Sequence, residues 1–277
     1  MSLEDQRAIV GACLLLGGLA LAPMVVALSK FWIPGRNNFF ARWGFTHFTL
    51  VVIVYLCSGL LVSLAWNATI GDELGFAGIM LKAGLIFLAP AALIIKLALD
   101  LDPDKLKSLG FTWPGSVRAV LFGLVTYVLL IPALLGASLL WPWIFESLGG
   151  VPETQAVIQQ FIDLDPAQLA VPVLFAVLIQ PFFEELIFRG FLQPLLVQNF
   201  REFWGVILTS LLFALVHPLA VFLPVFALSL VLGGVMQRTQ RFASCWAVHA
   251  VHNGLMLLLV LGSPEAREFM DATGLTQ

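Results

Sequence analysis

Two adjacent glutamates and an arginine stand inside a long apolar run of this chain. Glu184, Glu185 and Arg189 lie within residues 169–197, a stretch long enough to cross a bilayer as a helix. Because a charge held in hydrocarbon is costly, ionisable side chains in such runs are functional candidates. Glu185 and Arg189 are four residues apart and can pair along one helix face. Glu184 points about 100° away and has no such partner in its own helix, which predicts one carboxylate held in place and one available for chemistry.

Three of the four histidines and an asparagine fall in later apolar runs. His217 ends one run, whereas His249 and Asn253 are four residues apart on one face of the last run. Counted at 1.5 Å per residue from the ends rich in basic residues, Glu184 and His217 lie roughly 20 Å deep and His249 about 10 Å deep. Since these groups are too costly to face lipid, we expect all four to meet in a cavity inside the bundle.

A carboxylate, two imidazoles and an amide suit hydrolysis. A glutamate can take a proton from water while a neighbouring imidazole orients that water or protonates the leaving group. An imidazole and an amide NH2 can donate hydrogen bonds to the oxyanion of a tetrahedral intermediate. One glutamate and two histidines would also suit a divalent metal such as zinc, completed by water. Each group alone could merely cap a helix or bond to a neighbour, but the set Glu184, His217, His249 and Asn253 favours a site.

The remaining histidines and the cysteines are interpreted as structural. His252 lies about 60° round the helix from His249 and could border the same cavity, but a bond to a neighbour is the commoner role. His47 receives the same interpretation. The cysteines lie in apolar runs and are interpreted as small hydrophobic residues: Cys13, Cys57 and Cys245. Cys245 is four residues from His249, which leaves a thiol nucleophile as a minor alternative.

Composition shows that membrane helices must position these residues. The chain is 60% hydrophobic and only 11% charged, whereas a soluble domain has about 25% charged residues. The net charge of -3 is small and argues against a nucleic-acid partner. We predict an all-α, multi-pass transmembrane bundle of about eight spans, with approximate bounds 8–28, 45–66, 76–99, 117–141, 169–197, 204–217, 219–236 and 242–261.

The chain is interpreted as a membrane protein with three regions. Residues 1–168 form four spans and an amphipathic piece, 154–164, that could lie along the membrane surface. Residues 169–262 form four further spans that carry every candidate site residue, and residues 263–277 form a short polar tail. The residues before the first span are acidic rather than basic, so we expect a retained anchor rather than a removed signal peptide.

The placement of arginine and lysine predicts the orientation. The loops after the first, third, fifth and seventh spans hold Lys30, Arg36, Arg42, Lys105, Lys107, Arg118, Arg201, Arg238 and Arg241. The opposite side holds Arg7 and Arg267. The positive-inside rule then places those four loops in the cytoplasm and both termini outside it, in the cell membrane if the source is bacterial.

Three short motifs occur in order on three predicted spans. Glu184 to Arg189 fits Glu-Glu-x-x-x-Arg, the end of the sixth span fits Phe-x-x-x-His with His217, and the last span fits His-x-x-x-Asn with His249 and Asn253. In these motifs the chain resembles the CAAX protease and bacteriocin-processing family (CPBP, Abi-type), the superfamily of type II CAAX prenyl endopeptidases. The resemblance covers roughly residues 170–261.

The resemblance implies an intramembrane endopeptidase with a cavity that opens toward the cytoplasm. It assigns activation of a water to Glu184 and His217, and stabilisation of the oxyanion to His249 and Asn253. The positions that match supporting roles are Glu185 and Arg189. The substrate would be a membrane-associated peptide or protein, and the resemblance leaves open whether a metal takes part.

Two alternatives come from other functional classes. A membrane immunity or binding protein could keep the protease fold without turnover, although the presence of all four catalytic-position residues speaks against this. A transporter with a proton relay would also use buried glutamate and histidine. The two halves of the chain show no obvious internal symmetry, and the polar residues concentrate in the second half, so the transporter ranks last.

Overall fold

The structure is a computed structural model that describes residues 2–32, 41–71, 74–101, 103, 105–150, 161, 164–165 and 168–262. These residues form helices joined by turns and contain no strand, so the all-α prediction is confirmed for them. The α-helices are α1 (Leu3–Leu19), α2 (Ala22–Trp32), α3 (Phe45–Thr69), α4 (Gly75–Leu101), α5 (Ser116–Ser147), α7 (Ala170–Leu174), α8 (Gln180–Glu185), α9 (Gln193–Leu215), α10 (Phe222–Thr239) and α11 (Phe242–Gly262). Two π-helical segments, η2 (Phe175–Ile179) and η3 (Leu186–Leu192), flank α8, and the 3₁₀ turns are η1 (Lys105–Leu109) and η4 (Leu219–Val221).

Seven helical stretches in the described part of the chain are long and apolar enough to cross a membrane, which makes this an integral multi-pass protein. The sequence suggests about eight because it counts two spans where the structure has one stretch of 46 residues, Ala170–Leu215. At 1.5 Å per residue that stretch would be about 70 Å long, more than twice the bilayer core. It does not run straight, because the backbone leaves the helical region at Arg201. Beyond this kink Gly205 lies so close to Val197 that a Cβ atom would not fit, so the chain folds back into two limbs.

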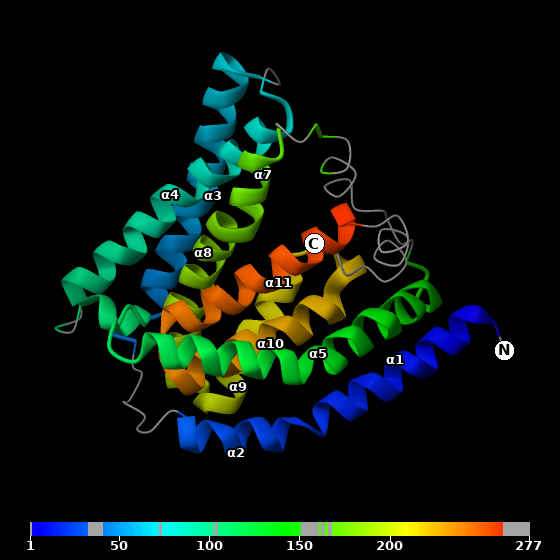
Figure 1. The fold of residues 1–277 in the computed structure, drawn as a ribbon. Coiled ribbons are helices and arrows are strands. Elements are labelled where there is room, and N and C mark those ends of the chain that lie inside the picture. Colours follow the sequence, from blue (N-terminus) through cyan, green and yellow to red (C-terminus); the bar gives the residue numbers. More distant parts are fainter. Residues whose placement is uncertain are drawn as a thin grey trace.

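The first predicted span is also interrupted. α1 and α2 are separated by a turn at Ala20 and Leu21, next to Pro23, whose missing N–H weakens a continuous helix there. α1 then lies along α5 (Figure 1). Cβ atoms at Gly18 and Gly136 would collide with the backbone of the opposite helix. Small residues thus let these two helices approach closely, as membrane helices do where no hydrophobic force drives them together.

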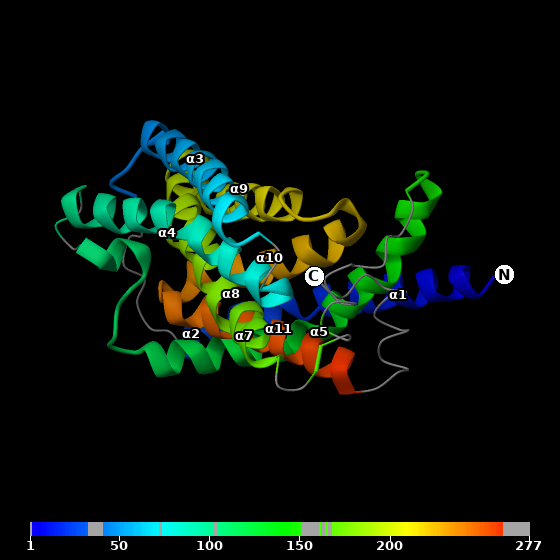
Figure 2. The same cartoon turned by 90° about the horizontal axis from the view of Figure 1, so that it is seen from above.

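The segment that carries the glutamates runs through the middle of the molecule. In Figure 2, α3 and α4 lie on one side of α8, and α5 and α11 lie on the other. One buried cluster joins α4 to this segment through Ile94, Leu186 and Leu195. A second cluster packs α5, α10 and α11 together. The glutamates are therefore held between two packed layers of helices, away from lipid.

The loops rich in basic residues come together at one end of the bundle. There Arg238 donates a hydrogen bond from Nη2 to the carbonyl of Ser29 at 3.1 Å, and Arg241 donates from Nε to the carbonyl of Pro114 at 3.1 Å. These bonds join the end of α2, the start of α5 and the loop between α10 and α11, which share one side of Figure 1. That this end faces the cytoplasm remains a prediction.

Most of the predicted amphipathic piece, 154–164, and all of the polar tail, 263–277, lie outside the described residues. Phe161 is described and is 5% exposed. Its ring packs edge-on against Phe76 at 4.9 Å between centroids. This part of the piece therefore contacts the protein core rather than the membrane surface.

Candidate active site

Two π-helical segments set the position of the glutamates. η2 and η3 each end two residues before a proline, and a glutamine stands between, in Gln180-Pro181 and Gln193-Pro194. Proline has no N–H to donate, and its ring clashes with the carbonyl four residues earlier, so a widened turn relieves both problems. Such π segments are frequent at functional sites. The short helix α8 therefore presents its two carboxylates between two widened turns.

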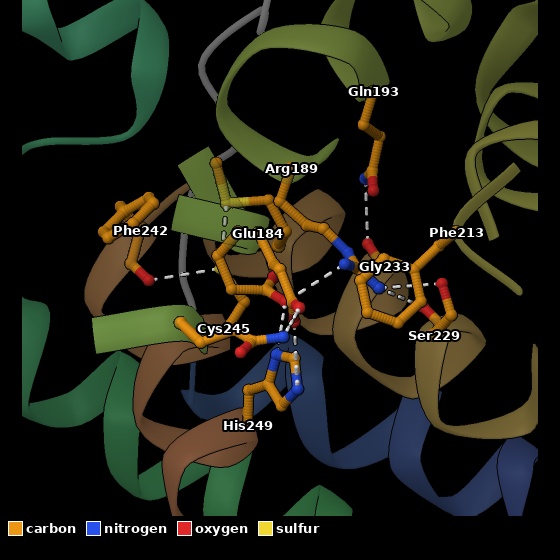
Figure 3. A network of polar contacts seen from close by, with 12 residues as sticks. Glu184, Arg189, Gln193, Phe213, Ser229, Gly233, Phe242, Cys245 and His249 are labelled. Atoms are coloured by element: carbon orange, nitrogen blue, oxygen red, sulfur yellow. Dashed lines mark hydrogen bonds and ion pairs between the residues drawn. The ribbon is translucent and has the colours of Figure 1, made fainter. Parts of the chain in front are cut away.

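Glu185 and Arg189 form the ion pair that their spacing predicts. Arg189 donates from Nη1 to Glu185 Oε1 at 3.0 Å, and both side chains are fully buried. The guanidinium also donates from Nη2 to Ser229 Oγ at 2.7 Å and lies 4.3 Å from the centre of the Phe213 ring (Figure 3). A buried charge is tolerated only when paired and hydrogen-bonded, and this arginine has both kinds of partner plus a cation–π contact.

His249 lies between the two glutamates. Its Nδ1 is 2.8 Å from Glu185 Oε1, and its Nε2 is 3.7 Å from Glu184 Oε2 (Figure 3). Glu185 is an acceptor already fixed by Arg189, which assigns the proton of a neutral imidazole to Nδ1 and leaves the lone pair of Nε2 directed toward Glu184. This Nε2 atom is buried and has no hydrogen-bond partner among the described residues. The sequence places His249 near the site but does not reveal that it bridges both carboxylates.

Glu184 has a partner in its own helix, contrary to the expectation from sequence. Gln180, four residues earlier, donates from Nε2 to Glu184 Oε1 at 2.8 Å. An amide donor at this spacing has the same geometry as a charged partner. The other oxygen, Oε2, faces His249. The side chain of Glu184 is 11% exposed against 0% for Glu185, so Glu184 is the more accessible of the two carboxylates.

His217 and Asn253 are not drawn into this contact. His217 Nδ1 is 2.6 Å from the carbonyl of Phe213, and among the described residues no hydrogen bond or ion pair joins His217 to either glutamate. The Phe213 ring lies next to both imidazoles, with its centroid 4.7 Å from that of His217 and 6.0 Å from that of His249. Asn253 donates from Nδ2 to the carbonyl of Ala176 in η2 at 3.0 Å. The structure thus places His249 Nε2 3.7 Å from Glu184 Oε2, whereas these hydrogen bonds of the other two predicted residues go to backbone carbonyls.

Comparison with known families bears on this cluster. Residues 166–255 match the family model described as type II CAAX prenyl endopeptidase, Rce1-like. The chain contains an Rce1-like domain. The match begins just before α7 and ends within α11, so it covers all three motifs and leaves α1 to α5 outside. No curated protein and no solved structure matches the chain.

Three polar residues of the Rce1-like domain that support the cluster are not singled out by the sequence analysis. They are Gln180, Gln193 and Ser229. Gln193 donates from Nε2 to the carbonyl of Gly233 at 2.9 Å and so ties the glutamate segment to α10 one turn from the Ser229 contact (Figure 3). A signal for the two glutamines exists, because Gln180 is four residues before Glu184 and Gln193 is four residues after Arg189. Ser229 lies in an unrelated apolar run and carries no such signal.

The other histidines and Cys245 have structural partners. His252 Nδ1 is 3.0 Å from the hydroxyl of Tyr127 in α5, which joins two helices of the bundle. His47 accepts a hydrogen bond at Nδ1 from the backbone N–H of Gly44 at 3.2 Å and so caps the start of α3. Cys245 is fully buried, and its Sγ is 3.1 Å from the carbonyl of Phe242. The structural interpretation of these three residues agrees with these contacts.

The donor set of the Rce1-like domain does not fit a metal ion as arranged. Within the described ranges, no group of three or more histidine, cysteine, aspartate or glutamate side chains is placed to hold one. A structural or catalytic zinc takes at least three protein ligands in a tetrahedral arrangement. The Nδ1 atoms of His249 and His217 are bound to Glu185 and to a backbone carbonyl, so each imidazole has only its Nε2 atom to offer. We therefore derive no step through a metal.

Proposed function

We propose that this chain is an intramembrane endopeptidase in which Glu184 and His249 activate a water for attack on a peptide bond. The observation that carries the proposal is the position of His249 between two buried glutamates, 2.8 Å from one and 3.7 Å from the other. The match of residues 166–255 to the Rce1-like family model supports a peptidase reaction. The proposed substrate is a peptide or protein segment that reaches the site from the membrane.

The three supporting side chains have distinct parts in this mechanism. Arg189 holds Glu185, and Glu185 accepts a hydrogen bond from Nδ1–H of His249, which fixes the orientation of the ring. In the neutral ring Nε2 then faces Glu184 Oε2 as one acceptor facing another. A water that donates a hydrogen bond to each would satisfy both atoms and have its oxygen polarised for attack. Gln180 holds the other oxygen of Glu184 and so sets the direction of Oε2.

The proton follows the usual course of general acid–base catalysis. Glu184 takes a proton from the attacking water and returns it to the nitrogen of the leaving group, a pairing of roles that is worth about 10²–10⁴-fold in rate. The 11% exposure of its side chain leaves Glu184 accessible, whereas Glu185 is fully enclosed and serves to orient. In this mechanism Glu184 therefore takes part in the reaction, and Glu185 positions His249.

The resemblance to the family assigns water activation to His217 and stabilisation of the oxyanion to His249 and Asn253. The contacts favour a partly different assignment of these roles. A neutral His249 that donates from Nδ1 has no second proton to offer an oxyanion. Asn253 uses one amide N–H on Ala176, and its second N–H is the better oxyanion donor. His217 donates to the Phe213 carbonyl, so its Nε2 is an acceptor suited to receive a proton rather than to bind an oxyanion.

The test compares membranes of cells that carry the wild type with those that carry Glu184→Gln at matched expression. Quantitative proteomics of membrane and secreted peptides would report the new chain termini. We expect termini that depend on Glu184 and are unchanged by the control Glu146→Gln, an exposed glutamate at the end of α5. Termini that persist in a folded Glu184→Gln protein would refute the proposal. Their absence from the wild type as well would favour a membrane binding or immunity protein that keeps the fold.

A further inference from the structure

A concave site lies on another face of α10 from the catalytic cluster. Ser229 and Gly233 face the glutamate segment, whereas the next residues along the helix, Leu230 and Gly234, line a groove of about 540 Å³ between α2, α5, α9 and α10. This volume falls in the range of small-molecule sites, about 300–1,000 Å³. None of the residues placed in the catalytic cluster lines the groove. Its occupant must therefore be sought separately from the peptidase reaction.

The groove is charged at one end and apolar along its length. Lys30, Glu202 and Arg238 lie at helix ends or at the kink of α9, all at the basic end of the bundle. From Arg238 the groove follows α10 for eight residues to Leu230, about 12 Å at 1.5 Å per residue. That depth is close to the hydrocarbon thickness of one leaflet, about 15 Å, half of a typical core. Most of the wall is aliphatic or aromatic, with Val25, Phe122, Leu130, Val206 and Ile207 among its members.

Two buried polar atoms interrupt the apolar wall. Thr126 is 4% exposed and Gln237 is 6% exposed, and both line the groove. Thr126 Oγ1 and Gln237 Oε1 have no hydrogen-bond partner among the described residues. A buried polar atom left unpaired costs about 1–3 kcal/mol, so its presence in an apolar wall indicates a polar partner on an occupant. Gln237 is next to the charged end, and Thr126 lies one helical turn beyond Phe122.

We propose that this groove binds one membrane phospholipid with a net negative headgroup. The phosphate meets Lys30 and Arg238, a headgroup hydroxyl donates to Gln237 Oε1, the hydroxyl of Thr126 donates to an ester carbonyl, and one acyl chain follows the apolar wall. Within a bilayer this order of charge, polar linker and hydrocarbon over one leaflet is the chemistry of a phospholipid. Two cations against one carboxylate at the mouth favour an anionic headgroup over a zwitterionic one, since each basic residue near a membrane surface contributes about 1 kcal/mol.

Gly234 allows a direct test. It lines the groove, and a Cβ atom there would meet nothing within 4 Å, so Gly234→Leu fills the groove without a backbone clash. Gly17 in α1 is the matched control, since its Cβ would also be in open space and it does not line the groove. The full chain would be purified in nanodiscs of equimolar phosphatidylglycerol and phosphatidylcholine, and native mass spectrometry would count the lipids retained per protein.

We expect the wild type and Gly17→Leu to retain one phosphatidylglycerol, and Gly234→Leu to lose it. Lys30→Ala should weaken retention about fivefold, the equivalent of about 1 kcal/mol, while Lys82→Ala on α4 should not. If Gly234→Leu does not fold, Val26→Trp blocks the same groove from α2, with Val10→Trp as its control. Equal retention in the blocked and control proteins would overturn the proposal. So would equal retention of the two lipids, or a dimer that Gly234→Leu dissociates, which would identify a second copy of the chain as the occupant.

Discussion

The buried pair of Glu185 and Arg189 predicts that stability and activity respond differently to the same substitutions. Both side chains are fully enclosed, and their charged atoms are 3.0 Å apart. Removing one partner of a buried pair leaves an uncompensated charge and typically costs about 3–5 kcal/mol, whereas replacing both partners by neutral groups is often close to neutral. We therefore expect Glu185→Gln and Arg189→Met each to destabilise the protein by about 3–5 kcal/mol, and the double variant to recover most of that loss.

Activity should follow a different course. The double variant removes the carboxylate that accepts the proton of His249 Nδ1 at 2.8 Å, so the imidazole loses its fixed tautomer and orientation. We expect peptidase activity to stay at the level of the single variants even where stability returns. The control pair is Lys96→Met with Asp100→Asn, an exposed pair at 2.6 Å, for which each change should cost at most about 1 kcal/mol.

The assay is a double-mutant cycle of unfolding free energies in one lipid or detergent environment, run beside peptide cleavage by the same preparations. A coupling energy of several kcal/mol between the two positions would agree with the structure. Single costs that simply add in the double variant would refute the buried pair. Recovery of cleavage together with stability would refute the positioning role of Glu185.

Two further predictions concern the supports of the site and of the bundle. Ser229→Ala removes the 2.7 Å hydrogen bond to Arg189 and should lower the free energy of unfolding by about 1.5–3 kcal/mol, with a lower kcat and a nearly unchanged KM. The control is Ser138→Ala, whose hydroxyl bonds only within its own helix and whose loss should leave the kinetics unchanged. Equal kinetics for both variants would contradict the role of Ser229. Gly18→Leu should separate α1 from α5 and lower the melting temperature of the protein by several degrees, whereas Gly17→Leu should have little effect. Similar melting temperatures for the two variants would contradict the close approach of these helices.

Local features of the site could be predicted because they depend on helix geometry alone. The pairing of Glu185 with Arg189 follows from their spacing of four residues, and the structure has it. The same spacing of four residues relates Gln180 to Glu184, because an amide donor fits the geometry of a charged partner. The cap formed by His47 likewise involves a residue three positions away. Depth counts were less accurate, because they separate His249 from Glu184 by about 10 Å along the membrane normal, whereas the structure places His249 Nε2 3.7 Å from Glu184 Oε2.

Contacts between distant segments were beyond the reach of these rules. Ser229 lies 40 residues from Arg189, and His249 lies 64 residues from Glu185. The rotation of α10 and α11 about their axes decides which side chains meet the glutamates, and packing sets that rotation. The role of His217 in activating the water stays a prediction; in the structure its Nδ1 is bound to the Phe213 carbonyl and its ring packs against the Phe213 ring.

The sequence by itself determined the membrane setting, the all-helical class and the identity of the residues available for chemistry. These depend on composition, run length and the cost of charge in hydrocarbon, which are properties of each segment alone. Tertiary structure alone decided that π turns flank α8 and that His249 stands between two carboxylates. Those outcomes depend on which side chains fill the space between helices. In a bilayer the helix arrangement is determined by close packing and by the pairing of polar groups rather than by hydrophobicity.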